Sequence, residues 1–139
     1  EREADALRDS VVEPSSESSA DSAAAKTLFD RSAFEALVAE ISLETAIHAF
    51  SIFVEDTRAR LDAFSDMKIA DDRNRVRLQA HTIKSTAGTF GFRQLSALAA
   101  RLESSSPDIA EEEFRSLVPE MGEAFASAMV QFTSARKAA

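Results

Sequence analysis

A histidine and a lysine lie three residues apart in the segment AHTIKS, residues 80–85. If this segment is helical, the two side chains are neighbours on the helix surface. A neutral imidazole can act as a nucleophile near pH 7, because its unperturbed pKa is about 6.5. An adjacent lysine can stabilise a group that becomes negative, such as a phosphoryl group on a ring nitrogen. His81 and Lys84 are therefore the candidate reactive pair.

The apolar pattern around this pair predicts that His81 faces solvent. With Val76 at 0° and a step of 100° per residue, the other apolar positions fall within about 40° of it. These positions are Ala80, Ile83, Ala87 and Phe90. On the same wheel His81 lies about 140° and Ser85 about 180° from Val76. The buried face is therefore opposite the histidine.

The charge around His81 differs from that of the whole chain. Between residues 73 and 101 the sequence has six cations and no acid, whereas the net charge of the chain is −8. The cations are Arg73, Arg75, Arg77, Lys84, Arg93 and Arg101. Such a basic segment suits a histidine that becomes negatively charged, and it would attract an acidic partner.

Composition excludes several classes of protein. The 139 residues fit one domain, and the acidic balance argues against a nucleic-acid binder. Cysteine is absent, so disulfides, thiolate nucleophiles and cysteine zinc sites are excluded, and two histidines are too few for a metal site of their own. We see neither a membrane span of ~20 apolar residues nor a signal-peptide pattern, and we expect a cytoplasmic protein. We expect the remaining histidine, His48, to be a solvated surface residue.

We expect all the elements that position His81 to be helices. The composition has only three Gly and three Pro, which leaves few sites for tight turns, and its ten Phe supply side chains for the core. Residues 1–27, rich in Ser, Ala and acids, are predicted to be a disordered linker. Residues 28–139 are predicted to form an antiparallel up-down four-helix bundle, with a short additional N-terminal helix as a lid.

Helix boundaries follow from capping signals. A capping box at Ser32 and Glu35 predicts the start of the short helix, and Ser42 can cap the next. The third helix is expected to start at Asp71 or Asp72 and to end at Gly91. The fourth is expected to cover residues 92–104.

The fifth helix is expected to start at residues 106–108, Ser-Pro-Asp, because proline is favoured at a first helical position. The acids at 111–113 would then lie in its first turns, where the helix dipole favours them. Pro119 is expected to kink or interrupt this helix.

Around His81 the chain resembles the histidine-containing phosphotransfer (HPt) domain family of phosphorelays. The family motif has a histidine, a lysine three residues on, a small residue next, and a glycine ten residues after the histidine. His81, Lys84, Ser85 and Gly91 occupy these positions. The apolar positions of the wheel also match, as does Leu102-Glu103 near the end of the following helix. The resemblance covers roughly residues 28–135.

The resemblance implies that His81 accepts a phosphoryl group from a receiver-domain aspartate and passes it to another receiver. Lys84 would stabilise the phosphoryl group, and Gly91 would be structural. The docking face for receivers would include Arg77, Leu78, Ser85, Gly88 and Arg93. The family usually has glycine where this chain has Ser85, a change that can slow transfer or alter partner preference.

The same resemblance implies a phosphoryl-group carrier rather than an enzyme. We expect a monomer, because one chain supplies a complete bundle. It would have no cofactor or metal of its own, because the receiver supplies Mg²⁺. The partners would be response-regulator receivers and a sensor or hybrid histidine kinase, with no nucleic acid and no membrane insertion.

Two alternatives stay open at this point. The chain could be a chemotaxis-kinase-type phosphoacceptor module, phosphorylated by a separate ATP-binding kinase domain. It could also be a non-catalytic helical adaptor, in which His81 would be dispensable. The serine-rich linker and the basic residues at 136–137 favour a C-terminal module of a hybrid kinase.

Overall fold

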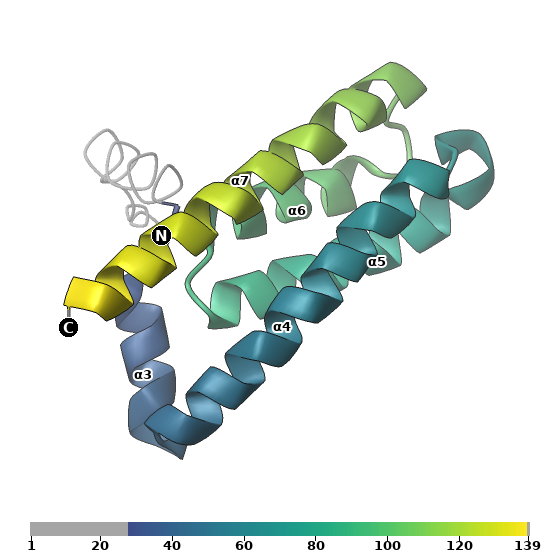
Figure 1. Ribbon diagram of the computed structural model, residues 1–139. Helices are drawn as coiled ribbons and strands as arrows, with labels where there is room; N and C mark the ends of the chain where they lie inside the picture. Colours follow the sequence, from purple (N-terminus) through teal and green to yellow (C-terminus); the bar gives the residue numbers. More distant parts are fainter. Residues whose placement is uncertain (1–27, 139) are drawn as a thin grey trace, which may run out of the picture.

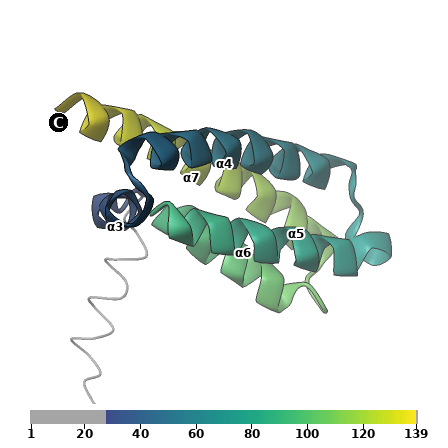
Figure 2. The ribbon, with the colours of Figure 1, turned by 90° about the horizontal axis from the view of Figure 1, so that it is seen from below.

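The computed structural model describes residues 28–138, and all regular structure in this range is helical. The helices are α3 (Arg31–Ile41), α4 (Leu43–Ala63), α5 (Ile69–Thr89), α6 (Arg93–Ser105) and α7 (Glu111–Ala138), with a short 3-10 helix, η1 (Phe64–Asp66), after α4. Successive helices from α4 to α7 run in opposite directions, and α3 crosses one end of the bundle (Figures 1 and 2). The predicted all-α bundle with a short additional helix is confirmed. The linker predicted for residues 1–27 lies outside the described residues.

Phenylalanine side chains build much of the core. All ten are buried. The Phe50 ring stacks on Phe132 with centroids 3.9 Å apart, which joins α4 to α7. Phe53 stacks on Phe90 at 4.7 Å, which joins α4 to the end of α5. Aromatic pairs of this kind add to the stability that burial of the rings alone provides.

The start of α3 differs from the prediction. Asp30, not Ser32, is the N-cap, and its carboxylate accepts a hydrogen bond from the Ser32 backbone N–H at 3.0 Å. Glu35 pairs with Arg31 at 3.0 Å instead of closing a capping box. Asp30 also binds the Arg93 guanidinium at 2.7 Å, so this cap has a second partner that the sequence spacing did not reveal. The predicted cap of α4 is confirmed, because the Ser42 hydroxyl accepts from the Thr45 N–H at 3.2 Å.

Helix α5 confirms the wheel and begins slightly earlier than expected. Its inward positions Val76, Ala80, Ile83 and Ala87 are fully buried. The helix begins at Ile69 and has a local distortion at Asp72, whose carboxylate accepts from the Lys68 N–H at 3.0 Å.

Gly91 follows α5 in the left-handed conformation, with φ of 80°. Its carbonyl accepts a hydrogen bond from the Asp30 N–H at 2.6 Å, which fixes the entry to α3 against the α5–α6 turn. A Cβ atom at Gly91 would collide with the Asp30 carbonyl oxygen. Only glycine fits this position without strain.

The predicted start of α7 is wrong. Residues 106–108 form a turn, and α7 begins at Glu111. The Ser106 hydroxyl is buried and donates to the Glu103 carbonyl at 2.9 Å, so Ser106 closes α6 instead of opening α7. The acidic run at 111–113 does form the first turn, as predicted.

Pro119 does not interrupt α7, contrary to one of the two outcomes expected (Figure 1). The helix carries the proline on its exposed side. The carbonyl that loses its partner there belongs to Arg115, four residues earlier on the same exposed side, where water can replace the missing N–H.

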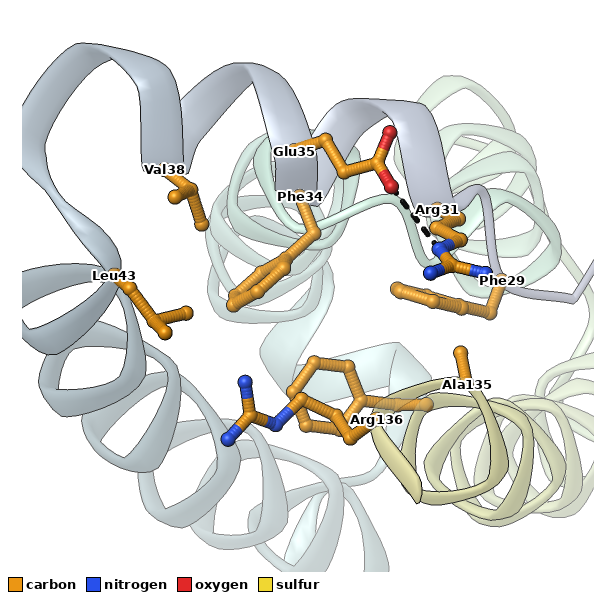
Figure 3. Close-up of a pocket in the computed structure, with 9 residues that line it drawn as sticks. Phe29, Arg31, Phe34, Glu35, Val38, Leu43, Ala135 and Arg136 are labelled. Carbon is orange, nitrogen blue, oxygen red and sulfur yellow. Dashed lines mark hydrogen bonds and ion pairs between the residues drawn. The ribbon is translucent and has the colours of Figure 1, made fainter. Parts of the chain in front are cut away.

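Helix α3 covers the bundle end as the predicted lid, but it leaves a mostly apolar cavity of about 190 Å³ against α4 and α7 (Figure 3). The cavity walls include Phe29, Phe34, Val38, Leu43 and Phe132. None of the described helices is long and apolar enough to cross a membrane.

Candidate functional site

His81 lies in the middle of α5 with 55% of its side chain exposed. Its neighbours Ala80 and Ile83 are fully buried, so the packing of α5 fixes the rotation of the helix and directs His81 outward. The orientation predicted from the wheel is confirmed.

The carboxylate of Glu103 joins His81 to Lys84. Its Oε2 lies 2.8 Å from His81 Nδ1, and its Oε1 lies 2.7 Å from Lys84 Nζ. Glu103 projects from α6, where its neighbour Leu102 is fully buried and anchors the helix against the core. The Ser96 hydroxyl also donates to the Lys84 carbonyl at 2.9 Å, so α5 and α6 are held together at this level. The three side chains form one hydrogen-bonded unit across two helices.

The charge state of this unit follows from its contacts. The hydrogen bond from Lys84, and then the one from His81, hold the pKa of Glu103 below its ordinary value. Glu103 is therefore a carboxylate at neutral pH and can only accept hydrogen bonds. Nδ1 of His81 must then carry the hydrogen, and in a neutral ring Nε2 has the lone pair. This is the arrangement that a nucleophilic Nε2 requires.

The sequence alone does not identify Glu103 as part of the site. The acid-free segment ends at Arg101, two residues before it, and Lys84 was expected to be available for a phosphoryl group. The available signal was the Leu102-Glu103 pair, which is typical of the family but indicates no contact by itself. Helix pairing brings Glu103 to His81 from 22 residues away.

The basic segment is less positive in space than along the sequence. Four of its six cations have a carboxylate partner from outside residues 73–101. The pairs are Arg75 with Asp72, Lys84 with Glu103, Arg93 with Asp30, and Arg101 with Glu113. Among the described residues, Arg73 contacts two carbonyls and Arg77 contacts the Asn74 side chain. Fewer of the cations near His81 therefore remain without a carboxylate partner than the sequence suggests.

Four of the five predicted docking residues share the exposed surface of α5. They are Arg77, Leu78, Ser85 and Gly88. Leu78 lies one turn from His81. It is 49% exposed, which is high for a large apolar side chain.

Arg93, the fifth predicted docking residue, has a structural contact. Its guanidinium donates a hydrogen bond to Asp30. The hydrogen bond from the Ser32 side chain lowers the pKa of Asp30 most, and the one from Arg93 lowers it further. Arg93 therefore fixes the start of α3, and its part in docking stays a prediction.

His48 lies on the exposed side of α4, as predicted. Its backbone carbonyl accepts from the Ser51 hydroxyl, and its ring has no carboxylate partner within residues 28–138. No group of three or more metal-ligating side chains occurs in the same range.

A family model described as the Hpt domain matches residues 48–136, which include the whole of α5, α6 and the His81 site. The chain belongs to the Hpt domain family. Histidine phosphotransfer in a phosphorelay is therefore the function of this Hpt domain.

The fold agrees with a solved member of the family. The crystal structure of histidine-containing phosphotransfer protein B (HptB) from Pseudomonas aeruginosa PAO1 matches with a TM-score of 0.71 and 21% sequence identity. The match covers 82% of this chain and 98% of that chain. A search of curated proteins gives no match to this Hpt domain.

Proposed function

We propose that His81 carries the phosphoryl group on Nε2, taking it from the aspartyl phosphate of one receiver domain and giving it to the aspartate of another. The observation that supports this most directly is the 2.8 Å contact between His81 Nδ1 and the Glu103 carboxylate. It occupies one ring nitrogen on an otherwise exposed imidazole. The other nitrogen is left to react.

The chemical step is a transfer between two nucleophiles. The Nε2 lone pair attacks phosphorus, the bond between phosphorus and the aspartate oxygen breaks, and the aspartate leaves as a carboxylate. The imidazole ring becomes positively charged as the Nε2–P bond forms. Glu103 accepts the Nδ1 hydrogen bond throughout and stabilises that positive charge, the role of the orienting carboxylate in other histidine sites.

Lys84 acts in this proposal mainly through Glu103. Its ammonium group keeps Glu103 ionised and holds the carboxylate in place, so Lys84 is a positioning residue. Its charge also favours the doubly negative phosphoryl group on the neighbouring turn.

We assign the Mg²⁺ of the reaction to the receiver. The carboxylate nearest to His81 is that of Glu103, and both of its oxygens already accept hydrogen bonds. This Hpt domain would contribute the nucleophile and a docking surface, so it is a carrier and not a complete enzyme. The exposed Leu78 beside Arg77 suits a receiver surface with an apolar patch and acidic groups.

The test is transfer from phosphorylated receivers. A panel of ³²P-labelled receiver domains is mixed with the wild-type chain and with His81→Gln. Acid-labile, base-stable label should appear on the wild type and be absent from His81→Gln. His48→Gln is the matched control, because His48 is also exposed, and it should be labelled like the wild type.

A second donor distinguishes the phosphorelay from the chemotaxis-type alternative. Purified ATP-binding kinase domains are offered in place of the receivers. Efficient labelling by a kinase domain, with none from any receiver, would contradict the proposed donor. Label that persists in His81→Gln would contradict the proposed site.

A further inference from the structure

Ser85 lies beside His81 on the flank that Glu103 does not occupy. On a helical wheel centred on His81, Lys84 lies about 60° to one side and Ser85 about 40° to the other. Lys84 reaches Glu103 at 2.7 Å, which places α6 on the Lys84 flank. Ser85 is exposed. Its side chain therefore adjoins the open side of the imidazole.

The hydroxyl of Ser85 differs from those of Thr86 and Thr89, the next two hydroxyl residues along α5. Thr86 donates to the Thr82 carbonyl at 3.0 Å, and Thr89 donates to the Ser85 carbonyl at 3.1 Å. Both hydroxyls follow the usual pattern for a helix, in which the carbonyl four residues earlier accepts the bond. The equivalent acceptor for Ser85 would be the His81 carbonyl, but Ser85 Oγ makes no hydrogen bond to any described residue. Its O–H is available to a group outside the chain.

A phosphoryl group on Nε2 of His81 would need hydrogen-bond donors. Lys84 is engaged with Glu103 on the Nδ1 side of the ring. Ser85 is one helical turn from His81, and side chains four residues apart on a helix meet. Side chains on a helix also lean toward the preceding turn, which brings the Ser85 hydroxyl toward His81.

We propose that the Ser85 hydroxyl donates a hydrogen bond to a non-bridging oxygen of the phosphoryl group on His81 and so stabilises the phosphohistidine. This inference rests on the proposed function of His81. It gives a role to the one motif position where the chain departs from the usual glycine. Glycine lets a receiver approach closely, whereas serine would retain the phosphoryl group for longer.

The experiment loads His81 chemically with phosphoramidate, so that it needs no receiver. All variants carry His48→Gln, which leaves His81 as the histidine that can be loaded. Ser85→Ala removes the hydroxyl and keeps Cβ, and Ser85→Gly restores the usual family residue. Ser51→Ala is the matched control, because Ser51 is an exposed helical serine beside the other histidine. Circular dichroism melting checks that each variant is folded.

Two quantities are measured by ³¹P NMR: the half-life of the phosphohistidine at pH 7 and the titration midpoint of its phosphoryl group. A charge-assisted hydrogen bond of ordinary net strength predicts a half-life about threefold to tenfold shorter in both Ser85 variants. The midpoint should rise by roughly 0.3 to 0.5 pH units, because the hydroxyl stabilises the doubly negative form. Ser51→Ala should change neither quantity.

Half-lives within twofold of the wild type and an unchanged midpoint in Ser85→Ala would overturn the inference. An effect in Ser85→Gly alone would also overturn it, because glycine weakens the helix without testing the hydroxyl. If phosphoramidate does not load His81, the same variants are loaded from a phospho-receiver, and failure of both donors would overturn the inference together with the proposed function. Loading by phosphoramidate but by no receiver would contradict the proposed function alone.

Discussion

The Glu103 carboxylate on α6 accepts a hydrogen bond from Nδ1 of His81 on α5 at 2.8 Å. This contact connects the packing of the bundle to the chemistry of the ring. Buried residues on both helices hold the two side chains at this separation, so the imidazole needs no reorganisation before it reacts.

Replacing Glu103 with glutamine should slow phosphoryl transfer. Glutamine keeps the size of the side chain but loses the charge that fixes the Nδ1 hydrogen and stabilises the positive ring. We expect transfer to His81 to slow by about tenfold or more, in line with other histidines that lose an orienting carboxylate. Stopped-flow or quench-flow transfer from a phospho-receiver measures the rate. Long-range ¹H–¹⁵N NMR should show a mixed tautomer in the variant, and an unaltered tautomer and rate would refute this role.

The lowered pKa of Glu103 predicts a pH-dependent contribution to stability. A carboxyl group whose pKa is lower in the folded state stabilises the fold above its unfolded pKa, and this stabilisation is lost as pH falls through the folded value. The wild type should therefore be more stable than Glu103→Gln at pH 7, and the difference should shrink as the pH falls below about 4. Urea unfolding at pH 7 and pH 3 tests this. A difference that grows toward low pH would have the wrong sign.

Gly91→Ala should destabilise the domain. The φ of 80° is unfavourable for alanine, and the new Cβ would collide with the Asp30 carbonyl. We expect a loss of about 2 kcal/mol or more in the free energy of unfolding. Gly122→Ala is the control, because nothing beyond the adjoining residues and backbone of its own helix lies within 4 Å of its added Cβ, and alanine in a helix should stabilise by roughly 0.5 to 1 kcal/mol. Equal effects from the two substitutions would show that the Gly91 conformation is unimportant.

Thr57→Val should stabilise the domain. Thr57 is fully buried in α4, and its hydroxyl has no hydrogen-bond partner among the described residues. A methyl group of similar shape removes the desolvation cost, and we expect a gain of about 1 kcal/mol in the free energy of unfolding. Thr86→Val is a suitable comparison, because its hydroxyl is hydrogen-bonded. If Thr57→Val were the more destabilising of the two, the hydroxyl of Thr57 would have a partner after all.

The sequence predicted features that depend on one helix at a time. The period of Val76, Ala80 and Ile83 was enough to orient His81, because burial of one apolar face fixes the rotation of a helix. Glycine at position 91 was also recognisable as a helix end, although its contact with Asp30 was not.

Features that depend on contacts between elements could not be predicted in this way. Asp30 and Ser32 are both good N-caps, and only the Arg93 guanidinium, 63 residues away, shows why Asp30 is used. Similarly, Glu103 reaches His81 only because α5 and α6 are antiparallel neighbours. Counting the cations of residues 73–101 therefore overestimates the positive charge of the site, because the carboxylates that pair with these cations lie outside that segment.

The proposed role of His81 Nε2 is tested by identifying the nitrogen that carries the phosphoryl group. The ¹⁵N-labelled chain is phosphorylated by a phospho-receiver, and the one-bond ³¹P–¹⁵N coupling is measured by NMR. We predict coupling to Nε2 of His81, with the Nδ1 hydrogen still bonded to Glu103. Coupling to Nδ1 of His81, or to either nitrogen of His48, would contradict the assignment of Nε2 as the phosphorylated atom.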